Sequence, residues 1–139
     1  FKKTHDYPAI LKINKLNKLH KYKIGKQNLK IESFPVQHGK IKSLLYKIND
    51  KCAYVSDVSE IYKKDFDKLY NLNYLVIDCL RYNFHPSHFN LDSAIEIIKV
   101  LKPKKAILTN LANDIDYKEI QKFLPNNVKP AYDGMNFLI

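Results

Sequence analysis

The chain has 139 residues, of which 45% are hydrophobic and 27% are charged, a balance that predicts one globular domain and excludes an extensively disordered chain. No apolar run approaches the roughly 18 residues that a membrane span needs, and no apolar core follows the first residues, so neither a membrane protein nor a secretory signal is expected. The formal net charge of +10 favours acidic partners such as phosphates and nucleic acid, although the lysines are spread along the chain and no groove-reading motif accompanies them.

The two cysteines, Cys52 and Cys79, form neither a CxxC pair nor a zinc-binding spacing. We expect both to be small buried residues in reduced surroundings, which favours a cytoplasmic location. The chain begins at Phe1 rather than Met, so a piece of a longer polypeptide is one interpretation.

Alternating apolar and polar residues predict strands, and apolar residues at helical spacing predict helices, in an order typical of an α/β domain. Ser59 and Asn90 are suited to cap helices, and Pro103 ends the second of these. The predicted elements are, in chain order, a strand at residues 9–13, a basic loop at 15–26, strands at 28–36, 41–48 and 52–56, a helix at 60–70, a strand at 74–77, a helix at 91–101, a strand at 106–108, a helix at 117–123 and a strand at 128–131.

Polar side chains capable of chemistry follow several of these strands. If the two reversals after the strand at 28–36 are tight turns, His38 and Asp57 lie at the same edge of the sheet. If the next two strands run parallel to the one before them, His85, His88 and Asn110 join this edge, where α/β sheets hold their sites. The sequence therefore predicts one edge that gathers three histidines, an aspartate and an asparagine.

Each of these residues also has an ordinary structural interpretation. His38 precedes a glycine and fits a loop, Asp57 is suited to cap a turn, and residues 85–88 fit a polar loop. Their predicted convergence on one edge favours the functional interpretation. Imidazole nitrogen and carboxylate oxygen together suit Zn²⁺ or Mn²⁺, and an aspartate is able to bridge two metal ions.

Six segments carry a resemblance to a known family. They are PVQHG at residues 35–39, AYVSD at 53–57, VIDCLR at 76–81, HPSH at 85–88, LTN at 108–110 and PAYDGM at 130–135. Together and in this order they resemble the second half of the metallo-β-lactamase superfamily, in the branch that contains the cyclic-phosphate phosphodiesterases. The resemblance runs from about Tyr7 to the C-terminus.

The resemblance implies a hydrolase that acts on phosphoric diesters through a two-metal site holding Zn²⁺ or Mn²⁺. It implies that His38 is a metal ligand and that Asp57 bridges the two ions. His85 and His88 are implied to lie in the loop that reaches the substrate phosphate, where one of them acts as general acid or stabilises developing charge. A phosphorylated small molecule or a nucleotide is the expected ligand class.

The resemblance also implies half of a four-layer αββα sandwich, a mixed sheet with flanking helices, so residues 1–139 are expected to form a single incomplete domain. Such a half leaves the inner face of its sheet uncovered. We therefore expect a partner, which is either the N-terminal half of the fold, in the same or a separate chain, or a second copy of this chain in a homodimer.

The sequence departs from the family at two places where metal ligands are expected. The motif His-x-His-x-Asp-His belongs to the N-terminal half and is absent, and Asn110 stands where a closing His is expected. A catalytic zinc needs at least three fixed ligands, so we expect the isolated chain, with His38 and Asp57, to be inactive. Two alternatives remain open: a folded relative that has lost catalysis, and a basic module that binds nucleic acid or a phosphorylated ligand.

Overall fold

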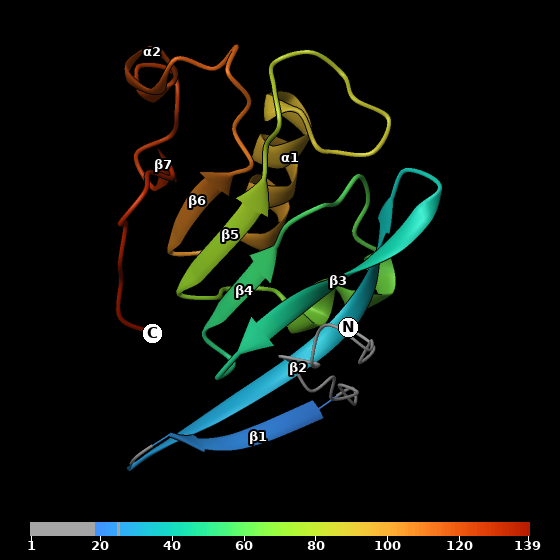
Figure 1. Ribbon diagram of the computed structural model, residues 1–139, viewed down its shortest axis with the longest axis vertical. Helices are drawn as coiled ribbons and strands as arrows, with labels where there is room; N and C mark the ends of the chain where they lie inside the picture. Colours follow the sequence, from blue (N-terminus) through green and yellow to red (C-terminus); the bar gives the residue numbers. More distant parts are fainter. Residues whose placement is uncertain (1–18, 25) are drawn as a thin grey trace, which may run out of the picture.

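The computed structural model describes residues 19–24 and 26–139 of the chain. Over these residues seven strands form one mixed sheet, in which the spatial order of the strands is their order in the sequence (Figure 1). This confirms the predicted α/β class with a mixed sheet. The strands are β1 (Leu19–Ile24), β2 (Gln27–His38), β3 (Ile41–Ile48), β4 (Cys52–Val55), β5 (Tyr74–Asp78), β6 (Lys105–Thr109) and β7 (Val128–Pro130).

Strand direction decides where the ends of the strands meet. The first four strands pair antiparallel, whereas β4, β5, β6 and β7 pair parallel. Because two reversals restore the direction of β2 in β4, five strands end at the same edge: β2, β4, β5, β6 and β7. We call this edge the rim; it carries His38, Asp57, Asp78 and Asn110 at or just after these strand ends. The strand directions that the sequence predicts are confirmed.

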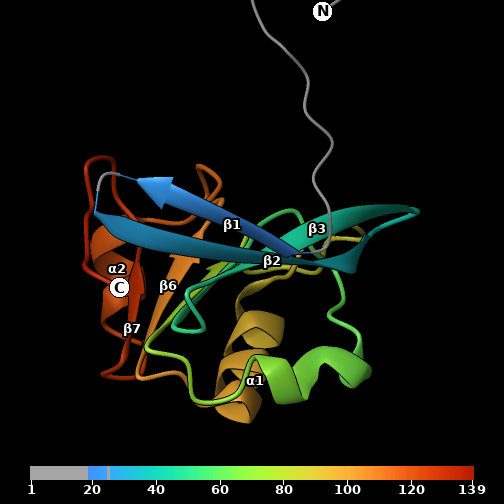
Figure 2. The same cartoon turned by 90° about the horizontal axis from the view of Figure 1, so that it is seen from below.

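The main core lies between one face of the sheet and two helical segments, η1 (Lys63–Lys68) and α1 (Leu91–Leu101), which Figure 2 shows on the same side of the sheet. Asn90 caps α1 as predicted, because its side chain accepts a hydrogen bond from the backbone N–H of Ser93 at 3.2 Å. Lys102 ends the helix in the left-handed conformation, at φ 51°. The helix thus fixes the loop that precedes it, which leads back to the rim.

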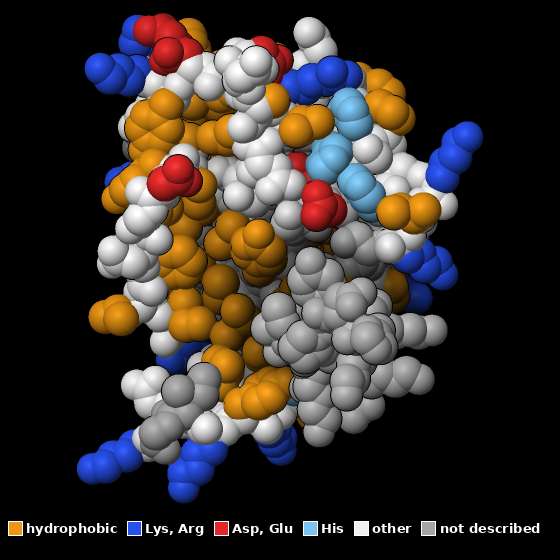
Figure 3. Space-filling view, in the orientation of Figure 1, with side chains coloured by type: hydrophobic (Ala, Val, Ile, Leu, Met, Phe, Trp, Pro, Cys, Tyr) orange, Lys and Arg blue, Asp and Glu red, His pale blue; other side chains and the backbone are white. Residues whose placement is uncertain are grey.

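The opposite face of the sheet carries neither α1 nor η1. Side chains alternate along β5, so Leu75 and Ile77 face the main core while Val76 faces away from it. Val76 forms a second, smaller apolar cluster with Cys52 and Ile107, against which part of the C-terminal segment packs. We call this surface the open face. Figure 3 shows hydrophobic side chains gathered over it.

The strand β1 occupies residues 19–24, where the sequence predicts part of a basic loop. It forms because it pairs antiparallel with the long strand β2 along its whole length, with Leu19 opposite Glu32. Backbone pairing with a neighbour outweighs the strand's charged composition, which the sequence pattern alone does not reveal. The strand predicted at residues 9–13 lies outside the described residues.

The helix predicted at residues 60–70 is wrong in type and extent, because only the 3₁₀ helix η1 forms there. Ser59 does not cap it. Instead, the Ser59 hydroxyl donates to the carbonyl of Gln37 at 3.3 Å and accepts from the backbone N–H of Gly39 at 3.1 Å. An antiparallel bridge between Gln37 and Glu60 holds the segment extended before η1 begins. The segment after β4 is thereby tied to the rim end of β2.

The last helix, α2 (Tyr117–Gln121), is shorter than predicted. Asp116 caps it by accepting hydrogen bonds from the backbone N–H groups of Lys118 and Glu119, both at 2.8 Å. None of the helices in the described part of the chain has the length and apolar character that a membrane crossing needs.

Both cysteines are free and buried, as predicted. Burial raises the pKa of Cys52 to about 11, and burial together with the charge of Asp78 raises the pKa of Cys79 to about 12. Both thiols are therefore protonated at neutral pH, and neither is activated as a nucleophile.

The turn between β3 and β4 carries ion pairs that predict acid sensitivity. Asp50 accepts hydrogen bonds from Lys30 at 2.9 Å and Lys47 at 2.8 Å, which lower its pKa from 3.8 to about 2. Because the folded-state pKa is depressed, the carboxylate stabilises the fold above about pH 4 and ceases to do so as the pH falls towards 2. Asp50→Asn should lower the free energy of unfolding at neutral pH by less than about 1 kcal/mol, since the pairs are largely exposed.

Urea unfolding near neutral pH and at about pH 4 and pH 2.5 measures this effect. The variant should lose less stability than the wild type over the acid range, and Asp133→Asn on an exposed turn is the control. Equal acid losses in Asp50→Asn and the wild type would contradict the assignment.

Candidate metal centre

The rim brings together the side chains that the sequence places after its strands. His38 is the last residue of β2, Asp57 follows β4 by two residues, and Asp78 is the last residue of β5. His88 lies in the loop between β5 and α1. In Figure 3 the histidine side chains of this region form one group beside an acidic side chain.

Three of these groups could hold a metal ion. One ligand atom each from His38, Asp57 and His88 lies within 4.8 Å of the other two, and the ring centroids of the two histidines are 4.7 Å apart. The sequence places His38 and Asp57 at the metal and His88 at the substrate phosphate. The structure brings a ligand atom of His88 within 4.8 Å of those of His38 and Asp57.

The imidazole of His38 is held by a backbone group. Its Nδ1 lies 2.6 Å from the carbonyl oxygen of Ser87. A carbonyl oxygen only accepts, so Nδ1 carries the proton and Nε2 is left with its lone pair. This is the arrangement by which proteins orient a metal-ligating histidine.

The imidazole of His88 is held in the same way by a buried carboxylate. Its Nδ1 lies 2.7 Å from Oδ2 of Asp78, which is completely buried and also accepts the backbone N–H of Val58 at 2.9 Å. Burial raises the pKa of Asp78, against the two hydrogen bonds that lower it. From the sequence, Asp78 is recognised only as part of the VIDCLR segment at residues 76–81, and no role is predicted for it. The signal that could have found it is a carboxyl group within a continuous apolar run from Leu75 to Cys79.

His85 lies beside this group but not in it. Its ring centroid is 5.2 Å from that of His88, and its Nδ1 accepts the backbone N–H of Ser87 at 3.3 Å. Partial desolvation and the positive charge of Arg81 lower the pKa of His85. The lowered pKa favours the neutral imidazole, and because Nδ1 accepts a hydrogen bond, the ring proton lies on Nε2.

Asn110 stands at the rim end of β6, as predicted, in the left-handed conformation at φ 61°. Its Nδ2 donates to Oδ1 of Asp57 at 3.4 Å and to the hydroxyl of Ser56 at 3.2 Å. The amide thus contacts the carboxylate that the family resemblance assigns to the metal.

The residues present fit a divalent transition-metal ion. Two imidazole nitrogens and one carboxylate oxygen form the donor set that Zn²⁺ and Mn²⁺ accept. Two ligand atoms bound to one zinc ion at about 2 Å lie roughly 3 to 4 Å apart, and the three groups are already within 4.8 Å of one another. Both histidines also have the partner on Nδ1 that such ligands need.

Gly39 allows the histidine loop to approach β2. Its φ is +56°, and a Cβ atom at this position would lie 2.8 Å from Cβ of Ser87. The missing side chain lets the backbone of Ser87 come within hydrogen-bonding distance of His38. Gly39 therefore positions both histidines, although it contributes no functional group.

The sequence model of the β-lactamase superfamily domain matches residues 1–109. A comparison with curated proteins finds no match.

Solved structures share the fold. A new diphosphatase from the PhnP family is 26% identical to this chain and superposes with a TM-score of 0.83, over 92% of this chain and 49% of its own. The short form of human tRNase Z is 15% identical, with a TM-score of 0.61, over 85% of this chain and 46% of its own. Zn²⁺-bound PqqB from Methylobacterium extorquens is 10% identical, with a TM-score of 0.63, over 80% of this chain and 50% of its own. The last two likenesses concern the fold alone, and the chain spans about half the length of each of the three structures.

The close approach at Gly39 predicts a local effect of substitution. Gly39→Ala should lower the free energy of unfolding by about 1–2 kcal/mol through left-handed strain, and it should also displace Ser87. The displaced carbonyl should shift the imidazole NMR resonances of His38 and His88. Gly134→Ala is the matched control, because Gly134 also has a positive φ, +89°, but no atom lies within 4 Å of its Cβ position. Unchanged imidazole resonances in a folded Gly39→Ala variant would refute the positioning role.

Proposed function

The chain belongs to the β-lactamase superfamily domain family and has the metallo-β-lactamase fold, and from this premise we propose that it supplies the C-terminal part of a metal-dependent hydrolase acting on phosphoric diesters. The observation that carries the proposal is the gathering of His38, Asp57 and His88 at the rim. The similarity to a diphosphatase of the PhnP family supports a phosphate-containing substrate.

In this proposal His38 and Asp57 bind metal, as the family resemblance implies. When bound, a divalent ion supplies Lewis-acid stabilisation to a phosphoryl oxygen. Zn²⁺ or Mn²⁺ suits the donors. The ligands of a second ion come from the N-terminal half, which carries the His-x-His-x-Asp-His motif in this family.

The loop between β5 and α1 provides groups for the substrate phosphate. Neutral His85 accepts at Nδ1, so its Nε2–H is free to donate to a phosphoryl oxygen. The guanidinium of Arg81 adds positive charge close to His85 and is fixed by donating to the carbonyl of Phe84 at 2.8 Å. His88, oriented by Asp78, lies beside His85 within the group that could hold the metal ion. These groups favour an anionic substrate at the rim.

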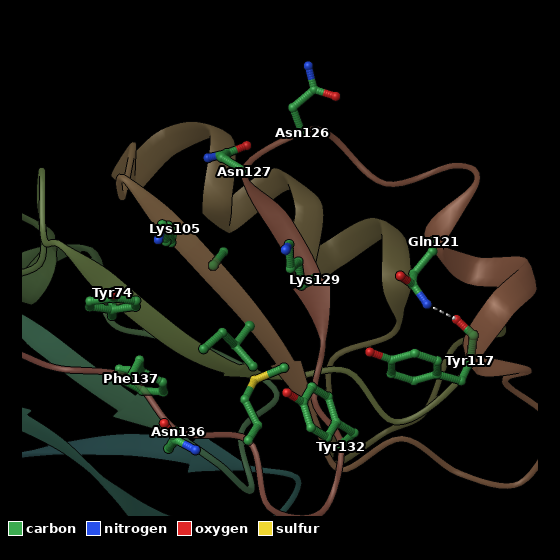
Figure 4. Close-up of a pocket in the computed structure, with 13 residues that line it drawn as sticks. Tyr74, Lys105, Tyr117, Gln121, Asn126, Asn127, Lys129, Tyr132, Asn136 and Phe137 are labelled. Carbon is green, nitrogen blue, oxygen red and sulfur yellow. Dashed lines mark hydrogen bonds between the residues drawn. The ribbon is translucent and has the colours of Figure 1, made fainter.

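The open face supports the proposal that another half completes the fold. Several aromatic side chains lie exposed on or beside it, among them Tyr54 at 42% and Phe137 at 36%. Phe137 stacks on Tyr74 with ring centroids 4.3 Å apart, beside a cavity of about 310 Å³ that the C-terminal segment forms with β6 and β7 (Figure 4). None of the rim residues lines this cavity. The open face is thus an apolar surface without catalytic groups, which suits docking of the N-terminal half.

One observation favours a second candidate, a folded relative without catalysis. Asn110 occupies a ligand position of the family and donates a hydrogen bond to Asp57. An amide at this position replaces the imidazole that a second metal ion would use as a ligand. The two candidates differ in turnover, so one assay separates them.

The assay compares the isolated chain with the chain joined to the N-terminal half of the similar PhnP-family diphosphatase, on bis(p-nitrophenyl) phosphate and a cyclic phosphate with added Zn²⁺ or Mn²⁺. We expect no turnover by the isolated chain and turnover by the completed fold. Asp57→Ala should lower kcat at least about 100-fold, since loss of a group that orients a metal ligand already costs 10- to 100-fold. Asp67→Ala on the exposed surface is the control.

Turnover by the isolated chain would contradict the need for a second half. A completed, folded assembly that binds metal but leaves both substrates intact would contradict the hydrolase proposal and favour the relative without catalysis. In that case Asn110→His should restore activity, because it returns an imidazole to the rim.

The open face also predicts self-association of the isolated chain. Sedimentation equilibrium should find dimers or larger species at micromolar concentration, because exposed apolar surface is buried between copies. The double variant Tyr54→Ser with Phe137→Ser should shift the population towards monomer. Phe123→Ser is the control, since Phe123 is 78% exposed but lies near α1 on the other side of the sheet. A monomeric wild-type chain that unfolds cooperatively would contradict this prediction.

A further inference from the structure

We infer that this chain by itself binds one divalent transition-metal ion, between Nε2 of His38, Nε2 of His88 and a carboxylate oxygen of Asp57. The inference deepens the proposed function and rests on it for the metal-binding roles of His38 and Asp57. What it adds is the third ligand, His88, and a single-ion site that forms without the N-terminal half.

The hydrogen bonds of the two histidines select the same nitrogen for the metal. Nδ1 of His38 donates to a backbone carbonyl, and Nδ1 of His88 donates to the buried carboxylate of Asp78. Both lone pairs are therefore on Nε2. Because Asp78 is fully buried and also held by the backbone N–H of Val58, the ring of His88 has a fixed orientation.

The structure distinguishes His88 from its neighbour His85. His85 accepts a hydrogen bond at Nδ1, so its proton is on Nε2 and both nitrogens are engaged or protonated. No carboxylate or carbonyl among the described residues orients its ring in the way that Asp78 orients His88. Of the two histidines in this loop, His88 is the one prepared to bind a cation.

The geometry of the three groups limits the site to one ion. Their ligand atoms lie within 4.8 Å of one another, so they surround a single point. Asn110, which stands where the family has a further His, offers an amide beside Asp57 instead of an imidazole ligand for a second ion. In the isolated chain Asp57 therefore acts as a terminal ligand and does not bridge two ions.

The donor set selects the class of ion. Two imidazoles and one carboxylate with open positions suit Zn²⁺, Mn²⁺, Fe²⁺ or Co²⁺, whereas Mg²⁺ prefers oxygen ligands. Three protein ligands are also the number found at catalytic zinc sites, which leave one position open for an exogenous group. The site is thus able to hold the ion and to present it to an anionic ligand.

The test is metal binding by the isolated full chain, stripped with a chelator and titrated with Zn²⁺ by calorimetry and with Co²⁺ by visible absorption. We expect one equivalent of either ion. His38→Ala and His88→Ala should each weaken binding at least about tenfold and change the Co²⁺ d–d bands. His85→Ala, one loop position away, should change the affinity less than about threefold and leave the bands in place. Mg²⁺ should not compete.

His88→Gln serves in place of His88→Ala if circular dichroism shows that the alanine variant is unfolded. The inference is overturned by an absence of binding, by two equivalents per chain, or by a folded His88 variant that binds as tightly as the wild type. Equal losses in the His85 and His88 variants also overturn it. The readout involves no substrate, so failure of the hydrolase assay leaves this inference intact. If the metal-binding inference fails, the hydrolase proposal still stands, with metal ligands supplied by both halves of the fold.

Discussion

The shared direction of the four strands that carry the rim side chains is the constraint on which the site depends. β2, β4, β5 and β6 end at one edge because two antiparallel turns precede the parallel part of the sheet. If one of these two turns were missing, β4 would run opposite to β2, and His38 and Asp57 would lie at opposite ends of the sheet. Backbone hydrogen bonds, rather than contacts between the functional side chains, therefore bring the metal-binding groups together, and the rim persists even where a family ligand is replaced, as at Asn110.

Precise orientation at the rim comes from contacts one layer beneath it. The buried carboxylate of Asp78 fixes His88, and the backbone of Ser87 fixes His38. The Ser87 contact needs the loop to lie against Gly39, where a Cβ atom would be 2.8 Å from Cβ of Ser87. The turn conformation at Gly39 is thus coupled directly to the imidazole of His38, and His88 is the next residue of the same loop. Burying Asp78 is unfavourable for its charged form, as its raised pKa shows, and the hydrogen bonds from His88 and Val58 offset part of this penalty.

Sequence periodicity and motif order predict the class of fold, the strand directions and the rim, because these depend on hydrophobic alternation and turn placement. They do not predict β1, whose charged residues 19–24 form a strand only through pairing with β2, or the short η1, where a bridge from Gln37 to Glu60 competes with a helix. The role of Asp78 is also missed, since it depends on a contact with His88 ten residues along the chain. The assignment of His85 to the substrate phosphate remains a prediction, whereas the metal-ligand role inferred for His88 departs from the substrate contact that the resemblance implies.

The molecule combines a candidate metal-binding rim within one half of a sandwich with an open apolar face that suits the other half. A zinc soak of crystals of this chain, with anomalous diffraction recorded at the zinc edge, tests the first part most directly. The account predicts one anomalous peak per chain, within about 2.3 Å of Nε2 of His38, Nε2 of His88 and a carboxylate oxygen of Asp57. A peak bound to His85 instead of His88, two peaks at the rim, or no peak in crystals that hold zinc elsewhere would contradict it.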